Sequence, residues 1–310
     1  MQKPKNVKII EAKDFEWVNI DRADLKGMDY LNQHFHFNEL DLRDCPPPIQ
    51  RPKLLERPNY LFVILLFPIY SRRKRTIETA EVDFFIGPNF LVTVHNGELE
   101  LLNNFFQECQ KFEGVRNKYL ESNPANLIYE LLNRLILYCF PMLNHIGMDI
   151  DNIERSIFDS QQKRMLSEIL LIKQNIVSFR KSMQAHKNII KKVIDEMPKH
   201  YRTDLLDPQF KSLVEYTKEI WDLLENYRET IDALQQTNES LISFRLNQIM
   251  KTLTIFSVIV FPLTLLSSIF GMNTPGIPWM NDSYGFWKVV IIMFIGMIIM
   301  LIFFKKKKWL

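Results

Sequence analysis

The stretch that decides the fold is 252–272, TLTIFSVIVFPLTLLSSIFGM, which runs for 21 residues without a charged side chain. About 20 consecutive apolar residues are enough to cross a bilayer as a helix. A second apolar run, 289–304, follows it, and its length reaches 19 residues when 286–288 are included. The sequence therefore predicts two membrane spans near its C-terminus.

Charge at the ends of the spans predicts their orientation. Four lysines at 305–308 follow the second span directly, whereas the loop at 273–285 contains neither Lys nor Arg. The positive-inside rule places the C-terminus in the cytoplasm, and two spans return the preceding chain, up to about residue 250, to the same side. The N-terminus lacks a continuous apolar segment, so no signal peptide is expected.

Composition and motifs exclude several classes of function. The net charge of +3 is too small to indicate a nucleic-acid partner. No P-loop, GxGxxG, HExxH or GxSxG motif occurs, so an ATP-driven pump or a hydrolase has no support and we expect no enzyme. The three cysteines form no CxxC pair, which suits a reducing compartment; they are Cys45, Cys109 and Cys139. Cys109 and Cys139 lie in apolar, helical surroundings, so we expect both in the core.

The first hundred residues are typical of a mixed α/β domain. NYLFVILLF at 59–67, VDFFIGPNF at 82–90 and LVTVHNGEL at 91–99 are β-branched or aromatic runs bounded by turn residues, as strands are. The apolar run at 60–70 is only 11 residues long, so we expect a buried strand there and not a third span. The basic run SRRKR at 71–75 is then expected at the tip of a hairpin.

From about residue 101 onward the pattern is helical. Residues 209–261, 53 in all, contain neither Gly nor Pro. A continuous helix of that length would extend about 80 Å, and we expect it to run from the cytoplasm into the first span. Pro198 and HYRTDLLDP at 200–208 are expected to separate it from the helices before it.

The long helix carries a polar stripe where it enters the apolar run. A polar stripe on a membrane helix must face protein or water, so two interpretations stay open: helix packing and a pore lining. The stripe has no carboxylate or His and offers only oxygens, which hard ions such as Mg²⁺ prefer. One chain cannot enclose a pore with two helices, so a pore needs a symmetric oligomer. The stripe positions are Asn247, Met250, Thr254, Ser257, Phe261, Thr264 and Ser268.

His34 and His36 in NQHFHFNEL are the other metal candidates. They would share a face in a strand, but no third ligand lies nearby in the sequence. We therefore expect ordinary histidines there.

The tripeptide GMN at 271–273 closes the first span, and with its context LNQIMKTLTIFSVIVFPLTLLSSIFGMN at 246–273 it resembles the signature of CorA-type divalent metal ion transporters of the CorA/ZntB superfamily. The ending FFKKKKWL at 303–310 is similar to that of bacterial members. FHFNELDLRDC at 35–45 and HIGMDIDNIERSIF at 145–158 resemble elements of the soluble domain. The resemblance covers about residues 10–310.

The resemblance implies an α+β (α/β/α) cytoplasmic domain with long stalk helices that continue into a two-span transmembrane hairpin, assembled as a funnel-shaped homopentamer in the bacterial inner membrane with both termini cytoplasmic. The implied boundaries are an α/β domain at 1–125, a helical stalk at 126–250, a pore helix at 251–272, a periplasmic loop at 273–285, a second span at 286–304 and a basic tail at 305–310.

The resemblance also implies passive influx of hydrated Mg²⁺, with Co²⁺ or Ni²⁺ as further ions, and no cofactor apart from a divalent cation as transported ion and regulator. Gly271, Met272 and Asn273 would receive the ion, with Asn273 as its contact. Thr264 and Asn247 would form polar rings, and Met250 with Leu253 an apolar constriction. The expected partners are divalent ions, membrane lipid and further copies of the chain.

The sequence departs from the family at several places. Phe261 stands where a pore methionine is frequent, Gln236 where an aspartate ring is expected, and Ser212 where some members have an aspartate that senses Mg²⁺. Asp149, Asp151 and Glu215 could take over that sensing. The loop lacks the acidic MPEL element and is closer to the zinc-transporting ZntB branch. Zinc transport and a non-conducting membrane-tethered coiled-coil scaffold or sensor therefore remain alternatives.

Overall fold

The computed structural model describes residues 4–13, 15–121, 124–158, 162–197, 207–272, 274, 276–279 and 282–309. The chain divides into two units, Met1–Gln235 and Gln236–Leu310. Long helix α9 (Asp207–Phe270) begins in the first unit and ends in the second, which also contains α10 (Gly285–Lys306). Of the break predicted at Pro198 and 200–208, residues 198–206 lie outside the described residues, and 207–208 already belong to α9.

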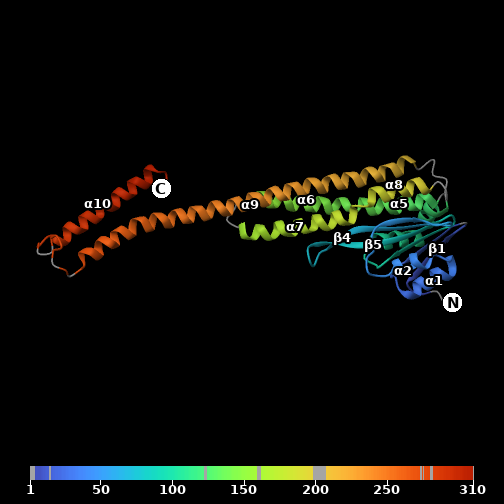
Figure 1. Ribbon diagram of the computed structural model, residues 1–310. Helices are drawn as coiled ribbons and strands as arrows, with labels where there is room; N and C mark the ends of the chain where they lie inside the picture. The colour runs from blue at the N-terminus through green and yellow to red at the C-terminus, as the bar shows by residue number, and fades with distance from the viewer. Residues whose placement is uncertain are drawn as a thin grey trace. The chain divides into compact units, whose positions relative to one another are not determined.

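The first unit begins with strands and short helices and continues as a series of helices (Figure 1). Its elements are β1 (Val7–Ala12), β2 (Phe15–Ile20), α1 (Leu25–Phe35), α2 (Glu39–Asp44), β3 (Lys53–Glu56), β4 (Leu61–Ser71), β5 (Thr76–Gly87), β6 (Phe90–His95), α3 (Glu100–Lys111), α4 (Glu113–Arg116), η1 (Asn117–Glu121), α5 (Pro124–Leu137), α6 (Cys139–Ser156), α7 (Gln162–Met183), α8 (His186–Glu196) and the start of α9.

The six strands form one sheet in the order β1-β2-β6-β5-β4-β3. Every neighbouring pair is antiparallel except β2 and β6, which are parallel. The predicted strands at 59–67, 82–90 and 91–99 are confirmed as β4, β5 and β6, and the run at 60–70 is a buried strand. The 71–75 turn joins β4 to β5, so the predicted hairpin is confirmed.

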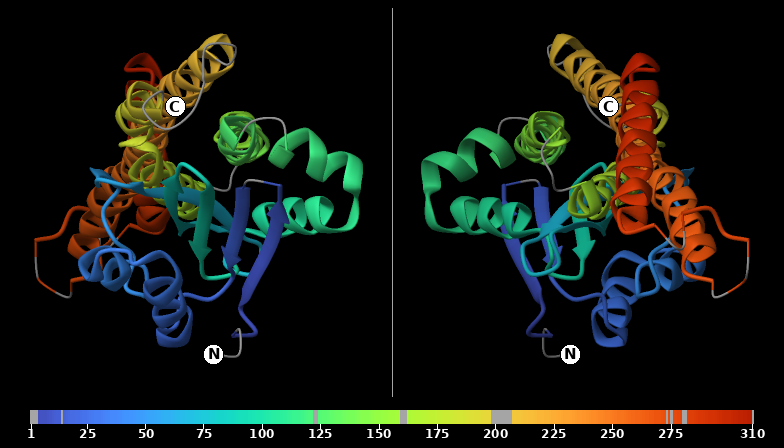
Figure 2. Two further views of the ribbon diagram at one scale, coloured as in Figure 1. Left: turned by 90° about the vertical axis from the view of Figure 1, so that its right-hand side faces the viewer. Right: turned by 90° about the vertical axis from the view of Figure 1, so that its left-hand side faces the viewer.

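Helices cover both faces of the sheet (Figure 2). On one face, α1 and α2 pack over an aromatic core in which Phe37 stacks on Phe85 with ring centroids 4.3 Å apart. On the other face, Trp17 packs edge-to-face on Phe106 of α3, and α7 lies against β4 and β5. The α/β/α architecture is therefore confirmed.

The two histidine candidates lie in and beside helix α1 and not in a strand. His34 stacks on Tyr30 and its ring Nδ1 lies 3.0 Å from the Tyr30 carbonyl oxygen. His36 caps the helix in the left-handed conformation. Their local roles are structural.

Two ion pairs connect helix α7 to helix α9. Lys173 of α7 contacts Asp232 at 2.7 Å, and Arg180, about two helical turns further along α7, pairs with Glu225. The Arg180 guanidinium also lies 4.6 Å above the Trp221 ring. These pairs fix the antiparallel register of α7 and α9 within the first unit.

The sheet buries two carboxyl groups on one face of β5. Asp83 is 1% exposed, and its Oδ1 atom has no hydrogen-bond partner in the described part of the chain. Glu81, two residues earlier, accepts a hydrogen bond from the Gln50 backbone amide. Burial raises the pKa of Asp83 well above its usual value, and the charge of Glu81 raises it further. Asp83 is thus held protonated under conditions that ionise it in the unfolded chain.

A raised carboxyl pKa makes the folded state bind more protons than the unfolded state, so stability falls as pH rises from about 4 toward the folded-state pKa. Asp83→Asn keeps a neutral hydrogen-bonding group and removes this cost. We expect the variant to unfold at a higher temperature than wild type at pH 8, by roughly 2–4 °C per kcal/mol recovered, and to lose most of that advantage at pH 4. Thermal scans at both pH values measure this, and equal shifts at the two would contradict it.

Candidate functional site

The second unit contains two helices that are long and apolar enough to cross a membrane, judged by length and composition. The apolar windows of α9 and α10 are exposed. A surface of this size is unfavourable in water. The expectation of two apolar helices is confirmed, and α9 continues as helix through Pro262.

The polar stripe lies on one exposed side of α9. At 100° per residue, its seven members fall within an arc of about 100°. All of them are exposed except Ser257, which is half-buried. The opposite side is the one that is shielded within the unit; its half-buried residues are Ile255, Ile259, Leu263, Leu266 and Phe270. The stripe is therefore left uncovered by the part of the chain that the structure describes.

Three of the four hydroxyl groups of the stripe are oriented by the backbone of their own helix. Thr254 Oγ1 donates to the Met250 carbonyl at 2.8 Å, Ser257 Oγ to Leu253 at 2.9 Å, and Thr264 Oγ1 to Val260 at 2.9 Å. Each hydroxyl thus uses its hydrogen within the helix. Its oxygen lone pairs remain able to accept hydrogen bonds from the water around a cation.

The stripe extends toward the first residues of the second unit. A shallow cavity of about 600 Å³ follows the same side of α9, and Asn247 lies at its end. Glu239 also lines it, an acidic residue outside the predicted stripe. Its spacing of four residues from Ser243 would have placed it on this side of the helix. The residues lining the cavity are Gln236, Glu239, Ser240, Ser243, Phe244 and Asn247.

At its other end the stripe leads to the GMN tripeptide. The Gly271 amide donates to the Ser267 carbonyl at 2.9 Å, and the Met272 amide to Ile269 at 3.3 Å, which closes the last turn of α9. Met272 is exposed. Asn273 lies outside the described residues, so its role stays a prediction.

The loop between the spans contains a single acid, Asp282. Its carboxylate accepts from the Tyr284 amide at 3.1 Å and is ion-paired with Lys288 of α10. The Trp279 ring stacks on Phe270, with centroids 6.1 Å apart. The only carboxylate of this loop is thus engaged in holding the start of α10, which leaves neutral oxygens as the groups on offer to an ion.

The basic tail lies beside the start of the apolar part of α9. Lys251 Nζ donates to the Lys308 carbonyl at 3.0 Å and lies 6.0 Å from the Trp309 ring centroid. This contact joins residues 57 positions apart, and no periodic pattern could have predicted it. It gathers lysines at one end of the two apolar helices, which is the distribution expected at a cytoplasmic membrane surface.

The three acids considered for metal sensing are not gathered into one site. Asp149 lines a cavity of about 330 Å³ together with Arg75, Arg164 and Glu168, and burial raises the pKa of its carboxyl group. Asp151 and Glu215 are exposed. Among the described residues, no group of three or more His, Cys, Asp or Glu side chains is placed to hold a metal. Sensing by these acids stays a prediction.

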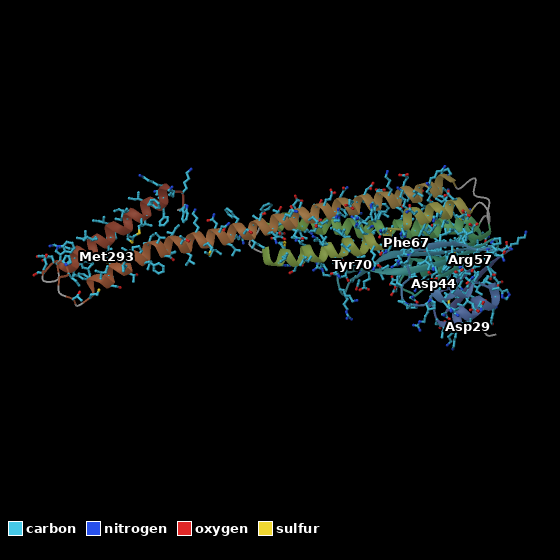
Figure 3. All side chains as sticks on the ribbon, viewed as in Figure 1. Asp29, Asp44, Arg57, Phe67, Tyr70 and Met293 are labelled. Carbon is cyan, nitrogen blue, oxygen red and sulfur yellow. The ribbon has the colours of Figure 1, made fainter. Side chains whose placement is uncertain are left out.

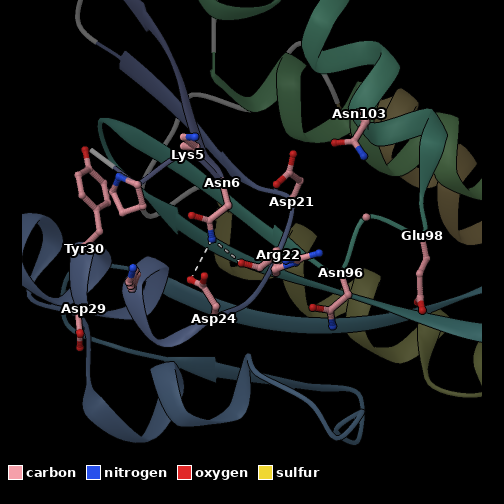
Figure 4. Close-up of a pocket in the computed structure, with 13 residues that line it drawn as sticks. Lys5, Asn6, Asp21, Arg22, Asp24, Asp29, Tyr30, Asn96, Glu98 and Asn103 are labelled. Carbon is pink, nitrogen blue, oxygen red and sulfur yellow. Dashed lines mark hydrogen bonds between the residues drawn. The ribbon is translucent and has the colours of Figure 1, made fainter. Parts of the chain in front are cut away.

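A further cavity of about 1070 Å³ lies where parallel strands β2 and β6 end (Figure 4). Asn6 bridges its wall by donating to the Arg22 carbonyl at 2.7 Å and to Asp24 at 3.0 Å. None of the site residues expected from the sequence lines it. The cavity combines free acids and bases, so its chemistry indicates no particular ligand.

Three comparisons relate the chain to known proteins. Residues 12–306 match the family model described as CorA-like Mg²⁺ transporter protein. The chain is 26% identical over 297 residues to the cobalt/magnesium transport protein CorA of Thermotoga maritima, which covers 95% of this chain and 83% of that protein. The CorA protein of Methanocaldococcus jannaschii is 22% identical over 309 residues, 97% of this chain and 94% of that protein.

A solved structure, that of the CorA magnesium transporter from Methanocaldococcus jannaschii, superposes with a TM-score of 0.83 at 20% identity. The match covers 97% of this chain and 93% of that one, so the two share a fold along nearly their whole length. Since the family match also spans nearly the whole sequence, the chain belongs to the family of CorA-like Mg²⁺ transporter proteins.

Proposed function

We propose that this protein is a channel-like transporter that lets hydrated divalent cations enter the cell passively, driven by the membrane potential. Mg²⁺ is the proposed main ion, with Co²⁺ and Ni²⁺ as further substrates. Relatives named as cobalt and magnesium transporters support this proposal. The observation that carries it is the uncovered, uncharged polar stripe on the apolar part of α9.

The proposal assigns a role to each part of the stripe. The Gly271 carbonyl and Asn273 receive the ion with its water shell, and Thr264 and Asn247 form polar rings along the pathway. Met250 and Leu253 form an apolar constriction that gates by losing water. Phe261 narrows the pathway between the polar rings. Neutral oxygens suit Mg²⁺ in particular because this ion gives up its water reluctantly.

The pathway requires several copies of the chain. Two apolar helices cannot enclose a pore, so we infer a ring of five subunits in which α9 of each copy faces the axis. The protein then lies in the bacterial inner membrane with both termini in the cytoplasm, as the lysines beside Trp309 favour. The domain boundaries at 125, 250, 272, 285 and 304 belong to the same proposal.

The driving force is sufficient for influx without a second substrate. Two positive charges crossing 100 mV gain about 4.6 kcal/mol. Competition among Mg²⁺, Co²⁺, Ni²⁺ and Zn²⁺ for uptake into proteoliposomes, with and without a pH gradient, tests the proposal. We expect Mg²⁺ to compete against Co²⁺ and Ni²⁺, and the rate to depend on the electrical potential and not on the pH gradient.

The zinc alternative is favoured by one observation. The loop lacks a free carboxylate, since Asp282 is paired with Lys288, and its sequence is closer to the zinc-transporting branch. Uptake of Zn²⁺ that outcompetes Mg²⁺ and follows the pH gradient would support that branch. Absence of uptake for all four ions would support the non-conducting scaffold.

A further inference from the structure

The tip of the β4–β5 hairpin is basic, and two of its four basic side chains have no ion pair in the described part of the chain. Arg72 and Arg73 are exposed, and within the described ranges neither forms an ion pair. Lys74 pairs with Glu78 of the hairpin itself at 2.8 Å. Figure 3 labels Tyr70 on this hairpin, and side chains near it extend away from α7.

The tip is held firmly by α7. Arg75 donates two hydrogen bonds to the Glu168 carboxylate, at 3.3 and 2.9 Å. The buried Asn175 side chain donates to the Arg75 carbonyl at 3.0 Å and accepts from the Ile77 amide at 2.9 Å. The two arginines therefore project from a fixed base, which lowers the entropy that a partner must remove to bind them.

An acidic patch lies on the exposed side of α9, at Glu219, Asp222 and Glu229. Their spacing of three and seven residues places them on one side of the helix. In the part of the chain that the structure describes, none of the three is ion-paired. The buried side of α9 lies roughly opposite the acidic patch; it contains Ile220, Leu224 and Ile231.

The tip and the patch lie at the same level of the first unit. Asn175 contacts the base of the tip and lies on α7 between Lys173 and Arg180. Those two residues pair with Asp232 and Glu225 of α9. This stretch of α9 contains Glu229, and the other two patch residues lie within two turns before Glu225. Measured along the axis of α9, the base of the tip is thus level with the Glu229 end of the patch.

The hairpin tip and the acidic patch face in opposite directions. The hairpin belongs to the sheet, α7 lies against the sheet, and α9 lies on the far side of α7 (Figures 1 and 2). A subunit cannot bring its own tip to its own patch. Complementary surfaces on opposite sides of one subunit make a head-to-tail contact, which closes into a ring when the rotation allows it.

We propose that the basic tip of the hairpin, Arg72 and Arg73, docks on the acidic patch of α9 in a second copy of the chain, at Glu219, Asp222 and Glu229. The contact belongs to the soluble part of the subunit and rests on the oligomer inferred above. Its charges add specificity and register to the assembly.

Cysteine cross-linking in the full-length protein in detergent tests the contact directly. Arg73→Cys combined with Asp222→Cys should give covalent ladders of several subunits under mild oxidation. Arg73→Cys with Asp29→Cys, a similarly exposed position on α1, should give none beyond the background of each single variant. The native cysteines are buried and serve as a constant background.

Charge exchange provides the second readout. Arg72→Glu with Arg73→Glu should lower the yield of oligomer captured by a lysine-independent cross-linker at low salt by at least threefold. Adding Asp222→Arg and Glu229→Arg should restore it. Two outcomes would overturn this contact and leave the proposed transport intact. One is an oligomeric protein in which Arg73→Cys with Asp222→Cys gives no cross-linked ladder, and the other is a charge-exchanged variant that does not recover the oligomer yield. A monomeric wild type would overturn both.

Discussion

Gly285→Ala should reduce Mg²⁺ uptake to near the background of empty liposomes. A methyl group at this position would lie 2.3 Å from the Trp279 carbonyl oxygen and 3.3 Å from its carbonyl carbon, both backbone atoms. The backbone must therefore shift. Trp279 stacks on Phe270, the last residue of α9, so the shift reaches the GMN end of the proposed pathway.

Gly296→Ala is the matched control for this experiment. It adds the same methyl group to the same helix, at a position where, among the described residues, no atom lies within 4 Å of it apart from its chain neighbours and the nearby backbone of its own helix. We expect uptake close to wild type from this variant. Equal activity of the two variants, at equal levels of folded protein, would show that the Trp279 contact has no bearing on transport.

Asp41→Ala should lower the free energy of unfolding of the first unit by about 3–5 kcal/mol, the usual cost of leaving one member of a buried ion pair alone. The Asp41 side chain is 1% exposed. It accepts hydrogen bonds from Arg57 Nε at 2.9 Å and Nη2 at 2.5 Å, and from the Tyr60 hydroxyl at 2.7 Å. Removing the carboxylate leaves three donors without this acceptor.

Hydrogen exchange of the β4 and β5 amides, measured on the full chain, reports this loss as faster opening of the sheet. Glu39→Ala is the control, because the Glu39 pair with Arg43 in the same helix is about 74% exposed on both sides. Such an i,i+4 surface pair contributes only about 0.3–0.5 kcal/mol. Similar hydrogen-exchange rates of the β4 and β5 amides in the two variants would mean that burial does not strengthen the contact of Asp41 with Arg57 and Tyr60.

The features that sequence predicted best are those with a long, uninterrupted signal. The absence of Gly and Pro over 209–261 predicted one helix, and α9 extends beyond both ends of that range. The β-branched runs predicted β4, β5 and β6 because strand preference and burial agree there. GMN and its context identified the family because they are local in sequence.

What could not be predicted depends on contacts between distant residues. The pairing of Lys251 with the Lys308 carbonyl and the clamp of Asn175 on the hairpin join segments 57 and 100 residues apart. The ion pair of Asp282 with Lys288 shows the same limit at short range. The sequence shows that Asp282 is the only acid of the loop, but it does not show that its carboxylate forms an ion pair. Separation in sequence leaves no periodic trace of such contacts.

The most direct test of the central claim is Mg²⁺ uptake into proteoliposomes under an imposed potential, negative inside, with no pH gradient. Wild type and Ser283→Ala, a control in the same loop, should take up Mg²⁺ at a rate that rises with the potential. Asn273→Ala should not respond. A wild type whose uptake ignores the potential, or an Asn273→Ala variant as active as wild type, would contradict the account.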